Sequence, residues 1–287
     1  MEFLRLNDAA LDSLLADDVP FGDLTTHLLD IGGLHGRMTF AARGAMVAAA
    51  VEDAARLLER AGCAVERVVG SGDQLPAGAA ILNADGTAAA LHRGWKMAQL
   101  LVETASGIAT ATRAIVEAAR AAHPDVAVAG TRKTAPCARA LSIAALVAGG
   151  AVPHRLGLSE TILIFAEHRA FLGTLAPAET VARIRRGAHE KKIVVEVGAV
   201  EEGVVWAKAG ADVIQTEKFA PPMVAELAAR LREAAPQTII AAAGGIGADS
   251  AAAYVAAGAR VIVTSAPYAA KPLDVAVRIA PDAKPAT

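Results

Sequence analysis

The second half of the chain has a regular pattern of hydrophobic and polar positions. Short apolar runs rich in β-branched residues recur there, separated by stretches with helical periodicity. The runs carry almost no polar alternation, which is typical of strands buried on both faces of a parallel sheet. Strands alternating with helices indicate βαβ units, and six such units favour a β/α barrel or an open doubly wound sheet. The predicted strands are Val126–Ala129, Ile162–Phe165, Ile193–Val197, Val213–Gln215, Ile239–Ala242 and Val261–Thr264, and the predicted helices are Pro177–His189, Val200–Ala209, Pro222–Ala234 and Asp249–Ala257.

The first hundred residues have a different pattern, which predicts a small α/β sandwich. An amphipathic helix is expected over Val51–Ala61, and Gly62 ends it. A long helix over Leu91–Ala105 leads into a second helix over Ile108–Ala121. Further predicted elements are a short helix at Leu11–Ala16, strands at Met38–Phe40 and Met46–Ala49, and an alternating edge strand at Asp274–Ile279.

The change of pattern divides the chain into two predicted domains. We expect an N-terminal α/β sandwich over residues 1–107, joined by a returning C-terminal strand at 273–287. A β/α barrel domain is expected over residues 108–272. The predicted fold class is therefore α/β.

Composition and charge narrow the class of protein. With 54% hydrophobic residues the 287-residue chain can bury a large core, and 28 Lys and Arg against 30 Asp and Glu leave a formal charge of −2. This balance argues against a nucleic-acid partner. No apolar run reaches the ~18 residues of a membrane helix, and the N-terminal sequence lacks the basic start and apolar stretch of a signal peptide. We therefore expect a cytoplasmic protein without a membrane partner.

Small residues follow two neighbouring predicted strands. Gly244 and Gly245 come just after the strand that ends at Ala242. Ser265 follows the strand that ends at Thr264. In β/α barrels the loops after the last two strands often bind phosphate, because glycines let the backbone approach the anion. We therefore expect the two glycines, Thr264 and Ser265 to bind phosphate, which favours the barrel. The alternative is a pair of ordinary turns.

Cations stand at the end of the predicted strand that closes with Ala129. Arg132 and Lys133 come directly after it and are flanked by two threonines. His154 and Arg155 precede the next strand. Arg offers a bidentate fork and Lys a point charge, so the set suits phosphate or carboxylate. A solvated loop and a structural histidine are the alternatives.

Two acids complete the candidate site. Glu196 lies inside an apolar strand, where an ionised side chain is expensive unless it is used, and Glu217 ends the following strand. Together they can hold Mg²⁺ or ribose hydroxyls. The alternative is salt bridges to Arg132, Lys133 or Lys191. The whole set describes an enzyme for a phosphorylated, polyanionic substrate, without naming its reaction.

Several motifs resemble the quinolinate phosphoribosyltransferase family (nicotinate-nucleotide pyrophosphorylase, carboxylating). They occur in the order and spacing of that family over nearly the whole chain. The nearer likeness is to its ModD branch, the pyrophosphorylase-like proteins associated with molybdenum-transport genes. The motifs that carry the family likeness are Gly22-Asp23-Leu24-Thr25-Thr26, Ser106-Gly107-Ile108-Ala109-Thr110, Thr131-Arg132-Lys133-Thr134-Ala135-Pro136 and His154-Arg155-Leu156-Gly157-Leu158, and those typical of the branch include Trp95-Lys96-Met97-Ala98-Gln99 and Ala243-Gly244-Gly245-Ile246.

This resemblance implies an incomplete β/α (TIM-like) barrel and a homodimer or higher homo-oligomer with a shared active site. It implies transfer of the phosphoribosyl group of 5-phosphoribosyl 1-diphosphate (PRPP) to the ring nitrogen of quinolinate or a related acid, with loss of pyrophosphate and carbon dioxide. By position, Lys133 would contact PRPP phosphates or the acceptor, and Glu196 and Glu217 would bind ribose hydroxyls and Mg²⁺. The acceptor acid would be held by Arg132, His154 and Arg155, with Lys96 reaching across the dimer.

Departures from the family pattern fall on the acceptor half of the site. Lys96 stands where the quinolinate enzymes have Arg, and Phe165 stands where they have Lys. The Asp-Asn that follows becomes Ala166 and Glu167, and Cys137 replaces a glycine. Phe165 would leave a carboxylate without its ammonium partner, so we expect a phosphoribosyltransferase-like enzyme with an altered acceptor.

The sequence is also compatible with two alternative functions. Lys133 at a strand end could form a Schiff base in an aldolase-like reaction. Alternatively, the chain is a non-catalytic oxyanion-binding or regulatory protein linked to molybdenum uptake. A pure oxyanion binder, however, has no use for Glu196 and Glu217 facing its anion.

Overall fold

The computed structural model describes residues 5–282 and divides into two compact units. The first unit comprises the described parts of Met1–Arg113, Thr134–Gly150 and Pro267–Thr287. The second comprises Ala114–Lys133 and Ala151–Ala266. Residues 108–113, 134–150 and 267–272 therefore belong to the first unit, although they were predicted to belong to the barrel domain. Residues 1–4 and 283–287, which the predicted sandwich includes, lie outside the described residues.

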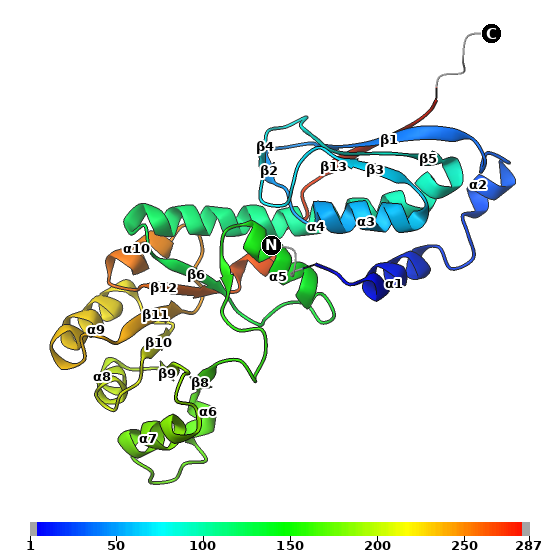
Figure 1. The fold of residues 1–287 in the computed structure, drawn as a ribbon. Helices are drawn as coiled ribbons and strands as arrows, with labels where there is room; N and C mark the ends of the chain where they lie inside the picture. Colours follow the sequence, from blue (N-terminus) through cyan, green and yellow to red (C-terminus); the bar gives the residue numbers. More distant parts are fainter. Residues whose placement is uncertain (1–4, 283–287) are drawn as a thin grey trace. The chain divides into compact units, whose positions relative to one another are not determined.

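The first unit is built on an antiparallel sheet with strand order β13-β1-β5-β3 (Figure 1). Along β1, buried residues alternate with exposed or half-buried ones, and Met38 and Phe40 are fully buried in the core. Helix α3 packs Leu57 and Leu58 into the same core. The elements of this unit are α1 (Asp8–Asp18), α2 (Leu24–Leu28), β1 (His35–Ala42), β2 (Met46–Val47), α3 (Val51–Ala61), β3 (Ala64–Arg67), β4 (Gln74–Leu75), β5 (Ala80–Thr87), α5 (Arg139–Ala148) and β13 (Val275–Pro281), with a 3-10 helix at Ala266–Ala269 that begins on the last residue of the second unit.

The C-terminal strand returns to the first unit. β13 pairs antiparallel with β1 at the edge of the sheet, from Ala42 opposite Val275 to Gly36 opposite Pro281. This confirms the edge strand expected at Asp274–Ile279. The pairing holds the end of the described chain to a strand more than two hundred residues earlier in the sequence.

One continuous helix replaces the two helices predicted between residues 91 and 121. α4 runs over Ala88–Ala122, and the break expected at Ser106-Gly107 does not occur. A Cβ atom on Gly107 would lie 2.3 Å from the backbone oxygen of Lys271. The glycine therefore permits a close approach of two backbones, and its presence in the sequence does not mark a helix end.

The second unit contains a sheet of seven parallel strands in the order β7-β6-β12-β11-β10-β9-β8. This is the incomplete β/α barrel that was expected, and five of the six predicted strands match within one residue at either end, whereas β10 extends two residues further, to Glu217. β7 was missed because it has only two residues. The strands are β6 (Ala127–Gly130), β7 (Val152–Pro153), β8 (Ile162–Ile164), β9 (Ile193–Val197), β10 (Val213–Glu217), β11 (Ile239–Ala243) and β12 (Val261–Thr264).

Helices follow the strands along the outer face of this sheet (Figure 1). Two of them begin with proline, α7 with Pro177 and α9 with Pro221. The first residue of a helix has no intrahelical acceptor for its N–H, so proline, which lacks this group, fits there. The helices are α6 (Ala166–Arg169), α7 (Pro177–Gly187), α8 (Val200–Lys208), α9 (Pro221–Ala234) and α10 (Ala251–Ala256).

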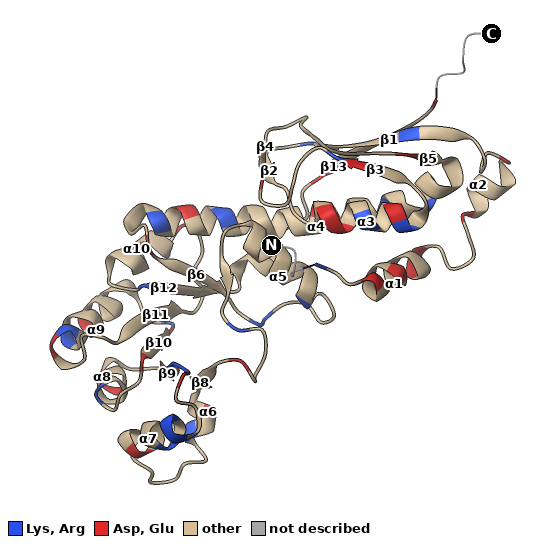
Figure 2. Cartoon of the chain, in the orientation of Figure 1, with Lys and Arg blue, Asp and Glu red and all other residues tan. Residues whose placement is uncertain are grey.

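Charged residues of both signs are interspersed on individual helices. Figure 2 shows Lys and Arg beside Asp and Glu on α3 and on α9. Within the described residues, no helix is long and apolar enough to cross a membrane.

We predict that Gly107→Ala destabilises the protein. The added methyl group would meet the backbone oxygen of Lys271 at 2.3 Å. Overpacking of this kind lowers the free energy of unfolding by about 1–3 kcal/mol, which exceeds the helix-propensity gain of Ala. The matched control is Gly187→Ala in α7, where an added Cβ meets nothing within 4 Å. Denaturant unfolding of both variants tests the prediction, and equal stability of the two would contradict it.

Candidate active site

A cavity of about 630 Å³ opens at the carboxyl ends of the parallel strands. Every one of the seven strands contributes to it, either with its last residues or with the segment that follows. Its lining includes ten residues expected to form the site: Arg132, Lys133, His154, Arg155, Glu196, Glu217, Gly244, Gly245, Thr264 and Ser265. Lys96 is not part of this lining; it is exposed on α4, donates to Gln99 and lies 5.0 Å from the centre of the Trp95 ring.

The loops after β11 and β12 form one side of the cavity. Gly244 has a φ of +101°, and a Cβ there would lie 2.8 Å from the backbone nitrogen of Lys218. Only glycine fits this backbone conformation at that distance. The hydroxyl of Thr264 donates to the carbonyl of Ile246 at 2.7 Å and accepts from the N–H of Ala266 at 3.0 Å. Thr264 therefore ties the two loops together, which leaves Ser265 and the glycine backbone to face an anion.

Positive charge gathers on another side, after β6 and β7. The Nε atom of Arg132 is buried and has no hydrogen-bond partner within the described chain. A buried guanidinium nitrogen without a partner is costly unless a ligand supplies the acceptor. Burial lowers the pKa of Arg155, and neighbouring Arg132 lowers it further. The positive charges of the two arginines therefore repel each other, and a bound anion would reduce this repulsion.

His154 faces the cavity as a neutral group at neutral pH. Burial lowers the pKa of its imidazole, and the charge of Arg155 acts in the same direction. Its backbone N–H donates to the carbonyl of Gly130 at 2.9 Å, which fixes the segment after β7 against β6. A neutral imidazole can donate a hydrogen bond to an acceptor without adding charge.

Phe165 contacts a residue from the opposite edge of the sheet. It follows β8, and Arg155 follows β7; these strands are the two edges of the seven-stranded order. The guanidinium carbon of Arg155 lies 5.5 Å from the centre of the Phe165 ring, a cation–π contact. The ring also stacks on His168, with centroids 5.8 Å apart and planes 18° apart. Phe165 was predicted to lie within a strand, but in the structure it lies just before α6.

Acidic side chains occupy the side formed by β9 and β10. The Nε2 of Gln215 donates to Oε2 of Glu196 at 2.7 Å, across directly paired positions of the two strands. Burial is the main cause that raises the pKa of Glu196; the hydrogen bond from Gln215 opposes it, and the charges of Glu217 and Glu167 add to it. Within the described chain neither Glu196 nor Glu217 forms an ion pair with Arg132, Lys133 or Lys191, and Glu217 pairs with Lys218 at 3.4 Å.

Sequence reasoning missed two residues that support the acids. Gln215 is a polar residue in an apolar strand, the same signal that singled out Glu196. Arg169 on α6 donates to the backbone carbonyl of Glu196 and pairs with Glu202 at 2.8 Å. Its guanidinium also lies 5.8 Å from the centre of the Trp206 ring. No local pattern in the sequence connects Arg169 with the end of β9.

The carboxylates of Glu196 and Glu217 are suited to bind a cation that is also coordinated by a ligand. Among the described residues no group of three or more His, Cys, Asp or Glu is placed to hold a metal ion. Mg²⁺, however, is usually bound by one or two carboxylates together with phosphates of the substrate. Glu196 and Glu217 fit this partial set, because their charges repel each other and a shared cation would relieve that repulsion.

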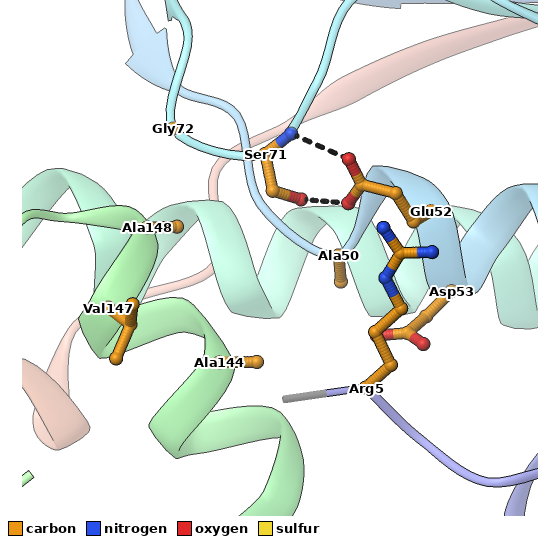
Figure 3. Close-up of a pocket in the computed structure, with 9 residues that line it drawn as sticks. All are labelled: Arg5, Ala50, Glu52, Asp53, Ser71, Gly72, Ala144, Val147 and Ala148. Atoms are coloured by element: carbon orange, nitrogen blue, oxygen red, sulfur yellow. Dashed lines mark hydrogen bonds between the residues drawn. The ribbon is translucent and has the colours of Figure 1, made fainter. Parts of the chain in front are cut away.

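A second, smaller cavity of about 170 Å³ lies in the first unit, and its acids already have partners (Figure 3). Glu52 accepts hydrogen bonds from the N–H of Ser71 at 3.1 Å and from its hydroxyl at 2.5 Å. Asp53 is 2% exposed, and its carboxylate accepts a hydrogen bond from the N–H of Leu6 at 3.1 Å. These bonds anchor the N-terminal segment and α3, so the cluster is explained by folding alone.

The sequence matches family models over nearly its whole length. Residues 23–106 match the N-terminal domain of quinolinate phosphoribosyl transferase, and residues 108–278 match the C-terminal domain. The chain is 48% identical to the "Putative pyrophosphorylase ModD" of Rhodobacter capsulatus over 249 residues, which cover 86% of this chain and 95% of that protein. It is 30% identical to the human nicotinate-nucleotide pyrophosphorylase (carboxylating) over 242 residues, 84% of this chain and 80% of that one.

Solved structures show the same fold. NadC from Streptococcus pyogenes superimposes with a TM-score of 0.87 over 96% of both chains, at 23% sequence identity. The arrangement of a half-barrel of parallel strands with a separate antiparallel sheet is therefore shared with that protein.

We predict that two substitutions move the pKa of Glu196 in opposite directions. Gln215→Leu removes the hydrogen bond that stabilises the charged carboxylate, so the pKa rises. Glu217→Gln removes a neighbouring negative charge, so the pKa falls. A titration followed by carboxyl-carbon NMR, with Glu196→Gln used to assign the signal, measures both. A shift of the same sign in the two variants would show that the described contacts do not set this pKa.

Proposed function

The chain belongs to the quinolinate phosphoribosyltransferase family, and we propose that it transfers the phosphoribosyl group of PRPP to the ring nitrogen of an acidic acceptor, quinolinate or a related acid. Pyrophosphate is the other product. The observation that supports this most directly is that ten candidate residues, from strands and loops far apart in the sequence, line one cavity. That cavity combines anion-binding loops, arginines and carboxylates, which are the groups that the reaction needs.

The two substrates occupy different sides of the cavity in this proposal. The 5′-phosphate of PRPP lies against the backbone at Gly244 and Gly245 and near the hydroxyl of Ser265. The acceptor carboxylate lies against Arg132, whose buried Nε has no partner in the described chain, with His154 beside it. Lys133, which is exposed at the rim, contacts the diphosphate.

The chemistry is a displacement at the anomeric carbon of the ribose. The lone pair of the ring nitrogen forms the new C–N bond while the C–O bond to diphosphate breaks, and pyrophosphate leaves with that electron pair. Positive charge develops on the ribose, where Glu196 and Glu217 stabilise it and bind its hydroxyls. Arginines and lysine stabilise the departing anion, and fixed geometry lowers the entropic part of the barrier.

A cation and a second subunit complete the proposal. Mg²⁺ held by Glu196 and Glu217 would neutralise charge on the diphosphate when bound. The active unit is a cytoplasmic homodimer, in which Lys96 of one subunit reaches the acceptor side of the other.

We predict that the protein binds PRPP in the presence of Mg²⁺ and that Lys133→Ala weakens this binding. Loss of a charge-assisted contact worth about 1.5–3 kcal/mol corresponds to a tenfold or greater loss of affinity. Lys191→Ala removes an exposed lysine outside the cavity and is the matched control. Isothermal titration calorimetry measures both, and a coupled assay for pyrophosphate release with quinolinate and nicotinate tests turnover.

Absence of detectable binding at millimolar PRPP would refute the transferase. The non-catalytic oxyanion binder makes the opposite prediction for the acids: Glu196→Gln would tighten binding of molybdate or phosphate. For the transferase, the same variant loses Mg²⁺-dependent pyrophosphate release.

A further inference from the structure

The side of the cavity nearest to Phe165 differs in chemistry from the side nearest to Arg132. Arg132 offers a buried guanidinium nitrogen that has no hydrogen-bond partner among residues 5–282, and an anion could supply one. Phe165 offers a phenyl ring that contacts Arg155 and His168, and Glu167, two residues later, also lines the cavity. A second anionic group on a ligand would therefore meet an apolar ring and a like charge at that side, where the cation in contact with the ring is Arg155.

Arg155 is already engaged by this ring. Its guanidinium lies 5.5 Å from the centre of Phe165, and the other member of the stack is His168. A cation held against an aromatic ring is restrained in orientation and presents a flat surface. Planar ligands stack on such surfaces at little cost in conformational freedom. The wall therefore suits a flat aromatic ring better than a flexible or bulky acid.

We propose that the acceptor is a planar aromatic nitrogen heterocycle bearing a single carboxylate, and that Phe165 is the residue that excludes a second one. This inference rests on the proposed function and specifies its substrate class. The carboxylate binds Arg132, and the ring lies against the wall formed by Phe165 and Arg155. The ring nitrogen attacks the anomeric carbon, pyrophosphate leaves, and the carboxylate stays on the product, so no carbon dioxide is released.

The first test compares two probes of known charge. Nicotinate carries one carboxylate on a pyridine ring, and quinolinate carries two. Calorimetric titration of the full-length protein with each acid is expected to give at least about tenfold tighter binding of nicotinate, a difference of ~1.4 kcal/mol. Equal affinity, or tighter binding of quinolinate, would overturn the proposal.

Two substitutions of the same residue separate charge from shape. Phe165→Lys supplies the ammonium group that a second carboxylate lacks, and we expect it to move the affinity ratio at least tenfold toward quinolinate. Phe165→Leu removes the stack without adding charge, and we expect it to weaken both acids while leaving nicotinate the tighter ligand. An unchanged ratio in Phe165→Lys, with a cooperative thermal unfolding transition like that of the unmodified protein, would contradict the assignment.

PRPP binding on the same samples keeps the two proposals apart. If the unmodified protein binds PRPP but neither acid, the substrate class is wrong while the transferase stands. If it binds neither PRPP nor the acids, both proposals fail. Where turnover occurs, equal release of pyrophosphate and carbon dioxide would also overturn the single-carboxylate acceptor, because the proposed reaction releases pyrophosphate alone.

Discussion

All seven strands of the second unit run in the same direction, and the candidate site depends on this constraint. Parallel strands place every carboxyl end at one edge of the sheet, so residues up to 134 positions apart in sequence, such as Thr131 and Ser265, line the same cavity. The hydrogen bond from Thr131 N–H to the carbonyl of Thr264 shows how close the ladder brings those two segments. An antiparallel sheet would divide the same loops between two edges.

The strand ends are held by contacts that lie outside the cavity as well as within it. Arg169 fixes the backbone at Glu196, and Thr264 fixes the loop after β11. The contact between Arg155 and Phe165 joins the segments after the two edge strands, which no backbone hydrogen bond connects in the described sheet. This side-chain contact therefore connects the two sides of the incomplete barrel, whose edge strands are not paired by backbone hydrogen bonds in the described sheet.

Sequence patterns predicted the strands well because most are short, β-branched runs buried on both faces. The ten cavity residues were identified at the ends of these runs, in the segments beside them and, for Glu196, within a run. They failed where the deciding contact is distant in sequence. The two helices predicted on either side of Ser106-Gly107 form one helix, and the close approach of the Lys271 backbone explains the glycine. Gln215 and Arg169 were missed because their role depends on Glu196 in a neighbouring strand or loop. The contact of Phe165 with Arg155 is likewise invisible in the local pattern.

Cationic and acidic side chains line the same cavity, and those of the described chain form no ion pair across it. In the described part of the chain, a buried nitrogen of Arg132 and a buried oxygen of Gln215 have no hydrogen-bond partner, and burial raises the pKa of Glu196. Each of these features costs stability that a partner across the cavity would recover, a hydrogen-bond partner for Arg132 and Gln215 and a cation for Glu196. A sequence selected for folding alone would bring the charges together. Their separation is what a site requires when a ligand with both an anionic end and a developing positive charge must lie between them, because the ligand then supplies the missing partners.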